Sequence, residues 1–476
     1  MLETPDFEIP RSSKRMMSKI FRTGTLATCL ALMMVANGVQ AGDKLHVIPH
    51  VAPAQQTAEY WISRSQQPDA LLLSAAQINA QNQRLRTQDP SMHELRRLPA
   101  QMSDKEVRAR VEKLSARPRR SLYDSQGQRI SDSMIDGWLA DLALESLPAQ
   151  VQPRFALVIA RADLRTFPTA TRVFSRVGDT DIDRFQESAL FPGTAVAILH
   201  ESRDRQWSFV VSARYAAWMR SDLLATGDAT TVLAYAERSP WLVVTGARAE
   251  TVYTPEAPQL SRLSLDMGTR IPLLADWPRE EPVNGQLPAA AHVVQLPSRD
   301  SEGRLQLRPA LLPHSADVSR HYLPLNQRSL LEQSFKFLGE RYGWGHSYEA
   351  RDCSGFVSEV YAGFGLEMPR NTGDQGKSPA FNIIPFTAEM NRDARREVLK
   401  TLQVGDLVYI PGHVMMVIGH DKGLTYVIHD TPDVRYADVA GSWPVNGVAV
   451  TPLEPLGSDD DTLYIDKIYS VVKMRP

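Results

Sequence analysis

The chain has 476 residues, of which 43% are hydrophobic and 23% are charged, and this globular composition excludes a wholly disordered, collagen-like or coiled-coil protein. Its 53 basic and 55 acidic residues leave a net charge of −2, and the sequence contains no basic tract, so we expect no nucleic-acid partner. The length predicts about three domains.

The first 41 residues have the pattern of a secretory signal peptide. A basic segment at residues 14–22 precedes a nearly uncharged apolar stretch at 23–36, and Val39-Gln40-Ala41 offers small residues at a cleavage site. The apolar stretch is shorter than the about 20 residues that span a bilayer, although an uncleaved N-terminal anchor is the alternative. We therefore expect export, to the periplasm, without stable membrane insertion after residues 1–41 are removed.

The next zone, residues 42–150, is polar and has helical patterning. A capping box formed by Ser103 and Glu106 begins one of its predicted helices. Because strand signals are few, we expect a helical N-terminal domain that packs against the rest of the protein and carries no chemistry.

Short β-type runs separated by Gly, Pro and Asp follow from residue 151. Residues 193–199 resemble residues 268–274, at an offset of 75 residues, which favours two copies of a small barrel. We expect SH3-like barrels at 151–235 and at 236–318, the second including a linker. One larger β-sandwich is the alternative.

Cys353 is the one cysteine that remains after the signal peptide is removed, so the mature protein contains no internal disulfide. Such a cysteine is either a buried packing residue or a reactive thiol. It follows Asp352, a good N-cap, and apolar residues recur at helical spacing from Phe356 to Phe364. A helix start lowers a thiol pKa and offers N–H groups to an oxyanion, so we expect Cys353 to be a nucleophile with a lowered pKa.

Two downstream histidines are predicted to share one face of a β-hairpin. Residues 413–430 contain two β-type runs, which we expect to be joined by a three-residue bulged turn. Pairing His420 with Leu424 makes His413 and His429 diagonal neighbours, with roughly 7–8 Å between their backbones. A register shift of one residue would place the two histidines on opposite faces.

These residues predict catalysis by a thiol. We expect His413 to take the proton of Cys353 and to return it to the leaving amine, and His429 to hold His413 in the required tautomer. The same residues and Asp352 are also zinc-ligand types. Because a helix start and a hairpin suit a nucleophile better, we expect neither a metal nor another cofactor.

Five spaced motifs in the C-terminal part of the chain resemble those of one family. They are Tyr342-x-Trp344-Gly345, Asp352-Cys353-Ser354-Gly355-Phe356, Pro369-Arg370-Asn371-Thr372, Gly405-Asp406-Leu407 and Gly412-His413-Val414. In this order they resemble the NlpC-type, papain-like cell-wall cysteine peptidases, some of which also carry a helical N-terminal clip and two bacterial SH3-like domains. The resemblance implies a multidomain α+β protein whose papain-like α+β peptidase domain occupies residues 319–476.

The resemblance also implies a substrate and further site residues. The expected reaction is hydrolysis of the γ-D-glutamyl–diaminopimelate (or lysine) bond of peptidoglycan stem peptides, in the wall or in released muropeptides. By the same resemblance, Tyr342 would assist the oxyanion or the substrate, Asp352 and Ser354 would line the groove near the substrate amine, and Arg370 with Thr372 would form another wall.

Several points stay open at the level of sequence. Some relatives hold a free L-Ala amine with an acidic residue of the first SH3-like domain, and the sequence does not locate that residue. His346 stands where relatives often have a second glycine, so it either narrows the groove or caps the turn. An inactive wall-binding SH3 protein and an amide- or acyl-transfer enzyme on the same scaffold are the alternative functions, and the oligomeric state is not predicted.

Overall fold

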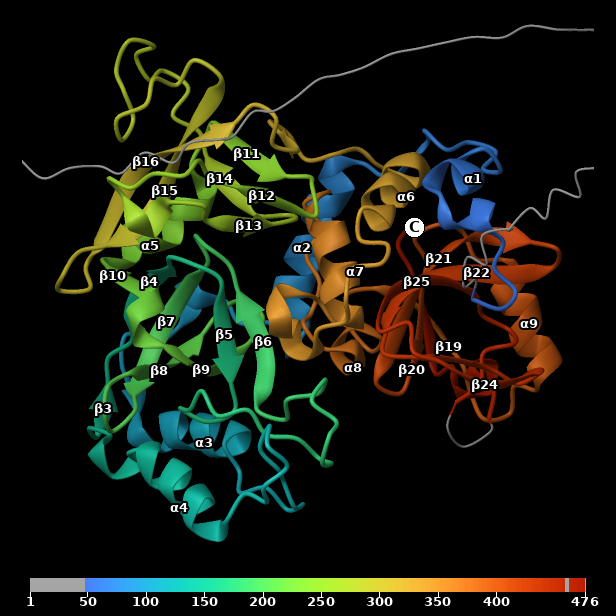
Figure 1. The fold of residues 1–476 in the computed structure, drawn as a ribbon, viewed down its shortest axis with the longest axis horizontal. Helices are drawn as coiled ribbons and strands as arrows, with labels where there is room; N and C mark the ends of the chain where they lie inside the picture. Colours follow the sequence, from blue (N-terminus) through green and yellow to red (C-terminus); the bar gives the residue numbers. More distant parts are fainter. Residues whose placement is uncertain (1–47, 459–461, 476) are drawn as a thin grey trace, which may run out of the picture. The chain divides into compact units, whose positions relative to one another are not determined.

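The computed structural model of the protein describes residues 48–458 and 462–475, which contain both helices and sheets, as expected for an α+β protein (Figure 1). The predicted signal peptide at 1–41 lies outside these residues. Within the described ranges, every helix is too short or too polar to cross a membrane.

The C-terminal part of the chain forms a six-stranded antiparallel sheet, and its strands, in spatial order, are β19 (Asn382–Pro385), β26 (Ser470–Lys473), β20 (Leu407–Ile410), β21 (His413–Asp421), β22 (Leu424–Thr431) and β25 (Gly447–Pro452). Helix α7 (Cys353–Ala362) buries Phe356 against Met416 and Ile428 on one face of this sheet. Helix α9 (Arg392–Lys400) packs on the other face, where its Leu399 joins the core around Met415. The sheet therefore has an apolar core on each face, which fixes where α7 begins relative to the strands.

The predicted helical zone at 42–150 divides between two cores. Its first elements are α1 (Ala58–Ile62), β1 (Leu71–Leu73) and α2 (Ala75–Gln88). Trp61 and Ile78 from these helices lie in the same apolar core as Phe356, and β1 pairs with β18 (Leu325–Asn326), which precedes α6 (Gln327–Phe335). The later helices, α3 (Asp104–Leu114) and α4 (Asp132–Asp141), pack instead with Trp218 of the first β region.

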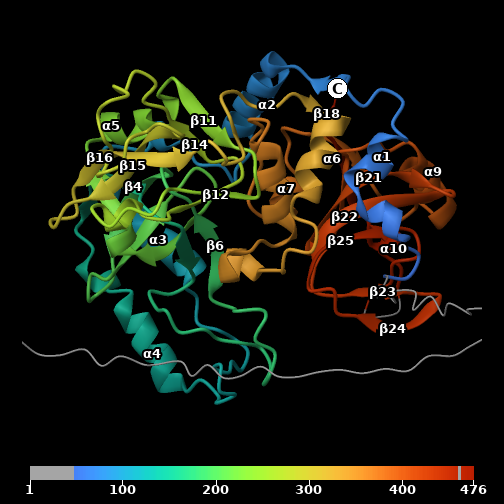
Figure 2. The same ribbon diagram turned by 45° about the horizontal axis from the view of Figure 1, so that its top comes forward.

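The first β region forms a seven-stranded sheet, whose strands in spatial order are β10 (Leu224–Gly227), β4 (Arg154–Val158), β7 (Ala195–Glu201), β8 (Trp207–Val211), β9 (Ala216–Arg220), β5 (Ala162–Arg165) and β6 (Gln186–Leu190). Figure 2 shows β4 and β6 of this sheet apart from the C-terminal strands β21, β22 and β25, with β6 on the side toward α7. Helix α5 (Ala229–Ala234) follows β10 along the chain.

The second β region forms separate sheets around a core of its own, which includes Leu242, Leu265 and Val294. Its strands are β11 (Trp241–Val244), β12 (Arg248–Glu250), β13 (Ser264–Asp266), β14 (Arg270–Pro272), β15 (Ala291–Arg299), β16 (Leu305–Pro313) and β17 (Val318–Ser319). Because the two β regions have distinct sheets and distinct cores, the structure does not form the single larger sandwich that was the alternative.

The two β regions repeat one turn, at the segments whose sequences resemble each other. Gly193 and Gly268 both adopt a left-handed conformation, with φ of 84° and 81°. Each glycine donates its N–H to the carbonyl of a valine in the first strand of its region, at 2.8 and 2.9 Å, and that valine donates to the carbonyl of the threonine after the glycine, at 3.0 Å in both cases. A Cβ at Gly268 would collide with Ala362 of α7, so glycine is required there for conformation and for space.

The hairpin of β21 and β22 has the predicted register at the histidines but not the predicted turn. Asp421 faces Leu424 across the two-residue loop Lys422-Gly423, in which both residues have positive φ, so the three-residue loop was wrong. A bulge after Val417 then shifts the pairing by one residue, and Val417 faces Val427, as expected. The bulge compensates for the shorter loop, and His413 and His429 share one face.

Candidate active site

One pocket, with a volume of about 270 Å³, contains the predicted nucleophile and all the predicted substrate-binding residues. From the C-terminal part of the chain, its lining residues are Tyr342, Trp344, Asp352, Cys353, Ser354, Arg370, Asn371, Thr372 and Gly412. The first β region closes the pocket with Arg184, Gln186, Glu187 and Tyr215. Residues far apart in the sequence therefore form one site.

Cys353 is the first residue of α7, as its sequence context predicts. The side chain of Asp352 caps the helix by accepting the N–H of Gly355 at 2.8 Å. The sulfur lies 4.0 Å from the carbonyl oxygen of Gly412, and the backbone N–H of Val414 also faces it. Cys353 is 5% exposed, so the thiol forms part of the pocket wall while most of its surface is buried.

The thiol of Cys353 is not acidic in this setting. Burial raises its pKa to about 12, the negative charges of Asp352 and Asp430 act in the same direction, and the N–H of Val414 acts against them. The expected lowering of the pKa by the helix start was therefore wrong for the unliganded protein, because the loss of hydration outweighs the helix N-terminus. Cys353 is a neutral thiol at neutral pH.

The two histidines form a hydrogen-bonded pair, which confirms their predicted proximity. Nε2 of His413 lies 2.7 Å from Nδ1 of His429, and Nε2 of His429 lies 2.9 Å from the hydroxyl of Thr451 in β25. Burial lowers the pKa of His413 to about 4 and that of His429 well below 6.5. Both rings are therefore neutral at pH 7, and Nδ1 of His413 takes no part in the hydrogen bond between the two histidines.

The sulfur of Cys353 contacts the backbone next to His413 and makes no direct hydrogen bond to the ring of His413 among the described residues. The backbone that it contacts belongs to Gly412 and Val414, the residues on either side of that histidine. Catalytic hydrogen bonds are often long in unliganded enzymes and shorten when substrate binds. The residues that line the pocket include Cys353 and Gly412 but neither His413 nor His429.

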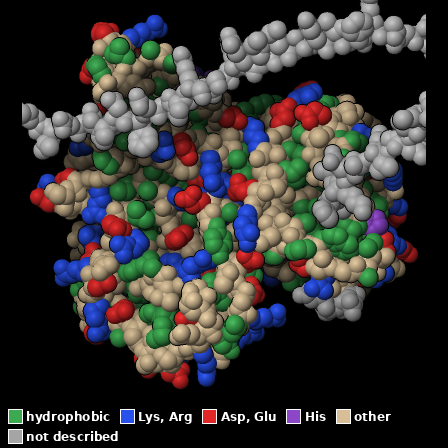
Figure 3. Space-filling view, viewed as in Figure 1, with side chains coloured by type: hydrophobic (Ala, Val, Ile, Leu, Met, Phe, Trp, Pro, Cys, Tyr) green, Lys and Arg blue, Asp and Glu red, His purple; other side chains and the backbone are tan. Residues whose placement is uncertain are grey.

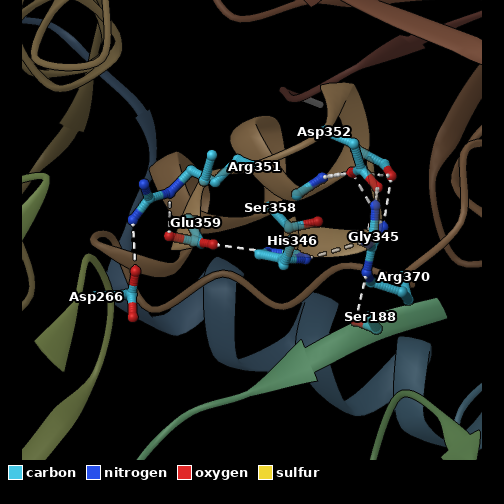
Figure 4. A network of polar contacts seen from close by, with 12 residues as sticks. Ser188, Asp266, Gly345, His346, Arg351, Asp352, Ser358, Glu359 and Arg370 are labelled. Carbon is cyan, nitrogen blue, oxygen red and sulfur yellow. Dashed lines mark hydrogen bonds and ion pairs between the residues drawn. The ribbon is translucent and has the colours of Figure 1, made fainter. Parts of the chain in front are cut away.

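Arg370 holds Asp352 in a buried polar network (Figure 4). It donates to Asp352 at 2.7 Å, to the hydroxyl of Ser188 in β6 at 2.7 Å and to the hydroxyl of Ser354 at 2.8 Å. Burial opposes ionisation of Asp352, but the charge of Arg370 outweighs it and holds the pKa of that carboxyl well below its usual range. The N-cap of the Cys353 helix is therefore a carboxylate fixed by an arginine.

His346 extends this network toward the second β region. Its Nδ1 accepts from Arg370 at 3.0 Å, and its Nε2 lies 2.9 Å from Glu359, which also binds Arg351 at 2.6 Å (Figure 4). Because arginine only donates, His346 carries its proton on Nε2. Burial lowers its pKa well below 6.5, so it links Arg370 to Glu359 as a neutral ring. His346 is buried and does not line the pocket, so, of the two alternatives left open by the sequence, it does not narrow the groove.

Sequence reasoning missed the acidic residue that the first β region contributes to the pocket. Glu187 of β6 accepts hydrogen bonds from the hydroxyls of Thr166, at 2.6 Å, and Tyr215. No local pattern around Glu187 or Tyr215 marks them, because only the docking of β6 against the C-terminal part of the chain brings them to Cys353. Thr451 was missed for the same reason, since strand pairing alone places it beside His429.

Asp430 follows His429 and is an unsatisfied buried acid. Both of its carboxyl oxygens are buried without a hydrogen-bond partner. Burial raises its pKa well above 3.8, and the charge of Asp352 acts in the same direction. A group whose folded pKa is raised above its unfolded value loses stabilisation as pH increases from the unfolded to the folded pKa. Asp430 therefore makes the fold less stable at neutral pH than at pH 4.

We expect Asp430→Asn to raise the free energy of unfolding at pH 7.5 relative to the wild type, by about 1–3 kcal/mol, because the amide carries no charge to desolvate. The difference between the two proteins should shrink toward pH 4, where Asp430 is protonated. Urea unfolding at both pH values measures it, with the exposed Asp276→Asn as the matched control. An equal difference at both pH values would contradict the assignment of Asp430 as a buried unpaired acid.

The zinc alternative requires Cys353, His413 and His429 to converge as ligands. Over residues 48–458 and 462–475, no three His, Cys, Asp or Glu side chains form a group that could hold a metal ion. The geometry at Cys353 therefore does not fit a zinc site.

Comparison with known families identifies two domains in the chain. Residues 339–443 match the NlpC/P60 family, and residues 172–220 match the SH3 domain of the SH3b1 type. The chain therefore carries an NlpC/P60 domain in its C-terminal part and an SH3b-type domain before it, and the resemblance stated from the sequence motifs is confirmed. No curated protein shows a significant sequence match to this chain.

Comparison with solved structures gives two matches to NlpC/P60 proteins. An NlpC/P60 endopeptidase from Photobacterium damselae subsp. piscicida matches with a TM-score of 0.70 and 16% identity, over 88% of this chain and 96% of that one. An NlpC/P60 family protein from Bacillus cereus ATCC 10987 matches with a TM-score of 0.46 and 21% identity, over 68% of this chain and 100% of that one. At this level of identity, the first match establishes a shared fold over most of both chains.

Proposed function

We propose that the protein is an exported cysteine endopeptidase that hydrolyses the γ-D-glutamyl–diaminopimelate (or lysine) bond of peptidoglycan stem peptides. One observation carries the proposal: the Cys353 thiol lies at a helix start in a pocket, against the backbone on both sides of a histidine that is already paired with a second histidine. The NlpC/P60 domain supports the reaction class. The signal-like sequence at 1–41 supports export to the periplasm.

In this mechanism, His413 is the base and later the acid. Its Nε2 is committed to His429, so the thiol proton passes to Nδ1. That transfer requires His413 to carry its resting proton on Nε2, with Nδ1 of His429 as the acceptor and Thr451 accepting the Nε2 proton of His429. In this assignment the hydroxyl of Thr451 acts as the acceptor that supports the tautomers of both histidines.

The reaction begins from a neutral thiol and a neutral imidazole. As the sulfur of Cys353 attacks the scissile carbonyl, its proton moves to His413, which then protonates the leaving amine as the C–N bond breaks. Water hydrolyses the resulting thioester, with His413 as the base. The N–H groups at the start of α7 are available to the oxyanion. Burial raises the pKa of Tyr342 well above 10, so its phenol stays protonated and serves as a further donor in the pocket.

The walls of the pocket favour a small substrate with a free amino terminus. Glu187 and Asp352 place two carboxylates in the pocket, and Arg370 keeps the second ionised. Because Arg370 already pairs with Asp352, the carboxylate available to an ammonium group is that of Glu187. The partners of Glu187 are the hydroxyls of Thr166 and Tyr215. The pocket volume of about 270 Å³ suits the end of a peptide rather than the middle of a cross-linked strand. We therefore propose released muropeptides, with Glu187 holding the amine of the first residue.

The substrate proposal is tested with defined muropeptides and product mass spectrometry. We expect cleavage of a stem peptide with a free amino terminus, and a loss of about 100-fold in kcat/KM when that amine is acetylated. Glu187→Gln should lower kcat/KM for the free peptide by a similar factor and leave the acetylated peptide unaffected. Equal cleavage of both peptides would reject the role of Glu187. No new peptide ends from any muropeptide would favour the inactive wall-binding alternative.

Thr451→Val tests the tautomer assignment, because valine keeps the shape of the side chain and removes its hydroxyl. We expect kcat/KM to fall by about tenfold, the effect of losing one hydrogen bond that holds His429 in its productive form. Thr451→Ser keeps the hydroxyl and should retain activity within about threefold of the wild type. If the serine and valine variants lose activity equally, packing rather than the hydroxyl of Thr451 is responsible.

A further inference from the structure

A second cavity, of about 390 Å³, lies on the far half of α7 and shares no lining residue with the catalytic pocket. Ser358, Glu359 and Ala362 of α7 form one part of its wall. The two repeated Gly-Thr turns, at Gly193 and Gly268, form another. The segments that resemble each other in sequence therefore meet at one cavity, for which the peptidase reaction has no use.

Three donors without partners belong to the residues around this cavity. Among the described residues, the guanidinium of Arg214 makes neither a hydrogen bond nor an ion pair, although the side chain lies at the cavity. The hydroxyl of Thr269 and Nε of Arg270 are buried and also have no hydrogen-bond partner. A buried donor without a partner costs about 1–3 kcal/mol, which applies to Thr269 and Arg270, whereas Arg214 is partly exposed and therefore accessible to an anion.

The acids in the same wall are already neutralised. Glu359 accepts from Arg351 and His346 (Figure 4), and Glu367 is paired with Arg86. Among the described residues, two cations of this wall have no carboxylate partner: Arg270, which donates to the carbonyl of Arg238 at 3.2 Å and lies over the ring of Trp241, and Arg214. Burial and the nearby charge of Arg370 lower its pKa, whereas Glu359 and Glu367 raise it, but an arginine remains a cation in a protein.

The rest of the lining is largely apolar and includes Leu95, Phe191, Pro192, Ala213, Met267 and Leu366. Ligand sites typically combine such a lining with a few convergent polar groups in a volume of roughly 300–1,000 Å³. A guanidinium without a carboxylate partner can bind an anion, and its planar fork matches a carboxylate.

We propose that this cavity binds a small carboxylate with an apolar body. The carboxylate pairs with Arg214, and the apolar body packs against the apolar part of the wall. The ligand is either a free organic acid or the C-terminal carboxylate of a short peptide. The cavity does not include Cys353, so binding of a carboxylate there can be tested separately from the proposed peptidase activity.

Calorimetry with the mature Cys353→Ala protein tests the site without turnover. The probes are benzoate, as a free acid, and N-acetyl-D-alanyl-D-alanine, as a peptide carboxylate, with benzamide as the uncharged control. We expect at least one carboxylate probe to bind, and benzamide to bind at least about tenfold more weakly than benzoate if benzoate is the ligand. Binding of benzoate would indicate that the ligand is a free organic acid, and binding of the dipeptide would indicate a peptide C-terminus.

Substitutions then locate the binding. Arg214→Gln should weaken the bound probe by at least about tenfold, Arg214→Lys should retain part of the affinity, and the exposed Arg119→Gln, as the matched control, should leave it unchanged. Thermal unfolding of each unliganded variant shows whether it is folded. Equal affinity in the wild type and Arg214→Gln, or no binding by either carboxylate probe to the folded parent protein, would overturn the proposal.

Discussion

Cys353→Ala is expected to lower kcat/KM for muropeptide cleavage by about 10⁴-fold or more, because the sequence has no other cysteine after residue 41 to form the thioester. Stability should change little, since the side chain loses a single sulfur atom at the wall of a pocket. Product mass spectrometry measures the loss, and thermal unfolding of the variant provides the control. Undiminished release of peptide ends by this variant would exclude Cys353 as the nucleophile.

The two histidines should differ in the same assay. His413→Ala removes the group that accepts and returns the proton, and we expect a loss of about 10⁴-fold. His429→Ala removes the partner on Nε2 of His413 but leaves the base, so the loss of kcat/KM should be smaller, about 100-fold. Equal losses in the two variants would contradict the separate roles of proton transfer and orientation.

We expect iodoacetamide, but not EDTA, to inhibit muropeptide cleavage by the wild-type protein.

Local patterns in the sequence predicted two geometric features of the candidate site. The N-cap at Asp352 and the apolar spacing after it located the start of α7 correctly. The pairing of His413 with His429 was also correct, although the predicted turn was wrong. The bulge after Val417 preserves the face of both histidines, because the sheet buries apolar side chains on each face and tolerates no net shift there.

Properties that arise from docking could not be predicted from the sequence. The pKa of Cys353 depends on how deeply the thiol is buried, and burial outweighs the helix start that the sequence reveals. Glu187 and Thr451 approach the site from other strands and carry no motif. Likewise, helical patterning in 42–150 shows where helices form, but not that Trp61 packs in the C-terminal core while Val107 packs with the first β region.

The surface agrees with the balance of charge in the sequence. On the face drawn in Figure 3, acidic and basic side chains of the described residues are interspersed rather than gathered by sign. Strong charge is instead found inside the molecule, where Arg351, Glu359, Arg370 and Asp352 are all buried. Such ions are stable only as paired groups, so a single substitution within the network has a large effect.

Arg370→Met should therefore lower the free energy of unfolding by about 3–5 kcal/mol at pH 7.5, because it leaves a buried carboxylate and a buried histidine without their partner. Lysine should not restore the loss, since one ammonium cannot replace the several fixed contacts of the guanidinium. Arg395→Met is the matched control: Arg395 is also buried, but its partners are backbone carbonyls far along the chain from the pocket. Both variants should be less stable than the wild type.

The pH dependence separates these two variants. In the wild type, the pKa of Asp352 lies below its unfolded value of 3.8, so its contribution to stability is present above about pH 4 and is lost as pH falls further. Without Arg370 the buried carboxyl takes up a proton more readily, so the deficit of Arg370→Met should be largest at pH 7.5 and should shrink toward pH 4, whereas that of Arg395→Met stays nearly constant. Urea unfolding at both pH values measures this difference. Because the charge on Asp352 would then be the cause, adding Asp352→Asn should relieve most of the deficit of Arg370→Met, and failure to do so would assign the loss to packing alone.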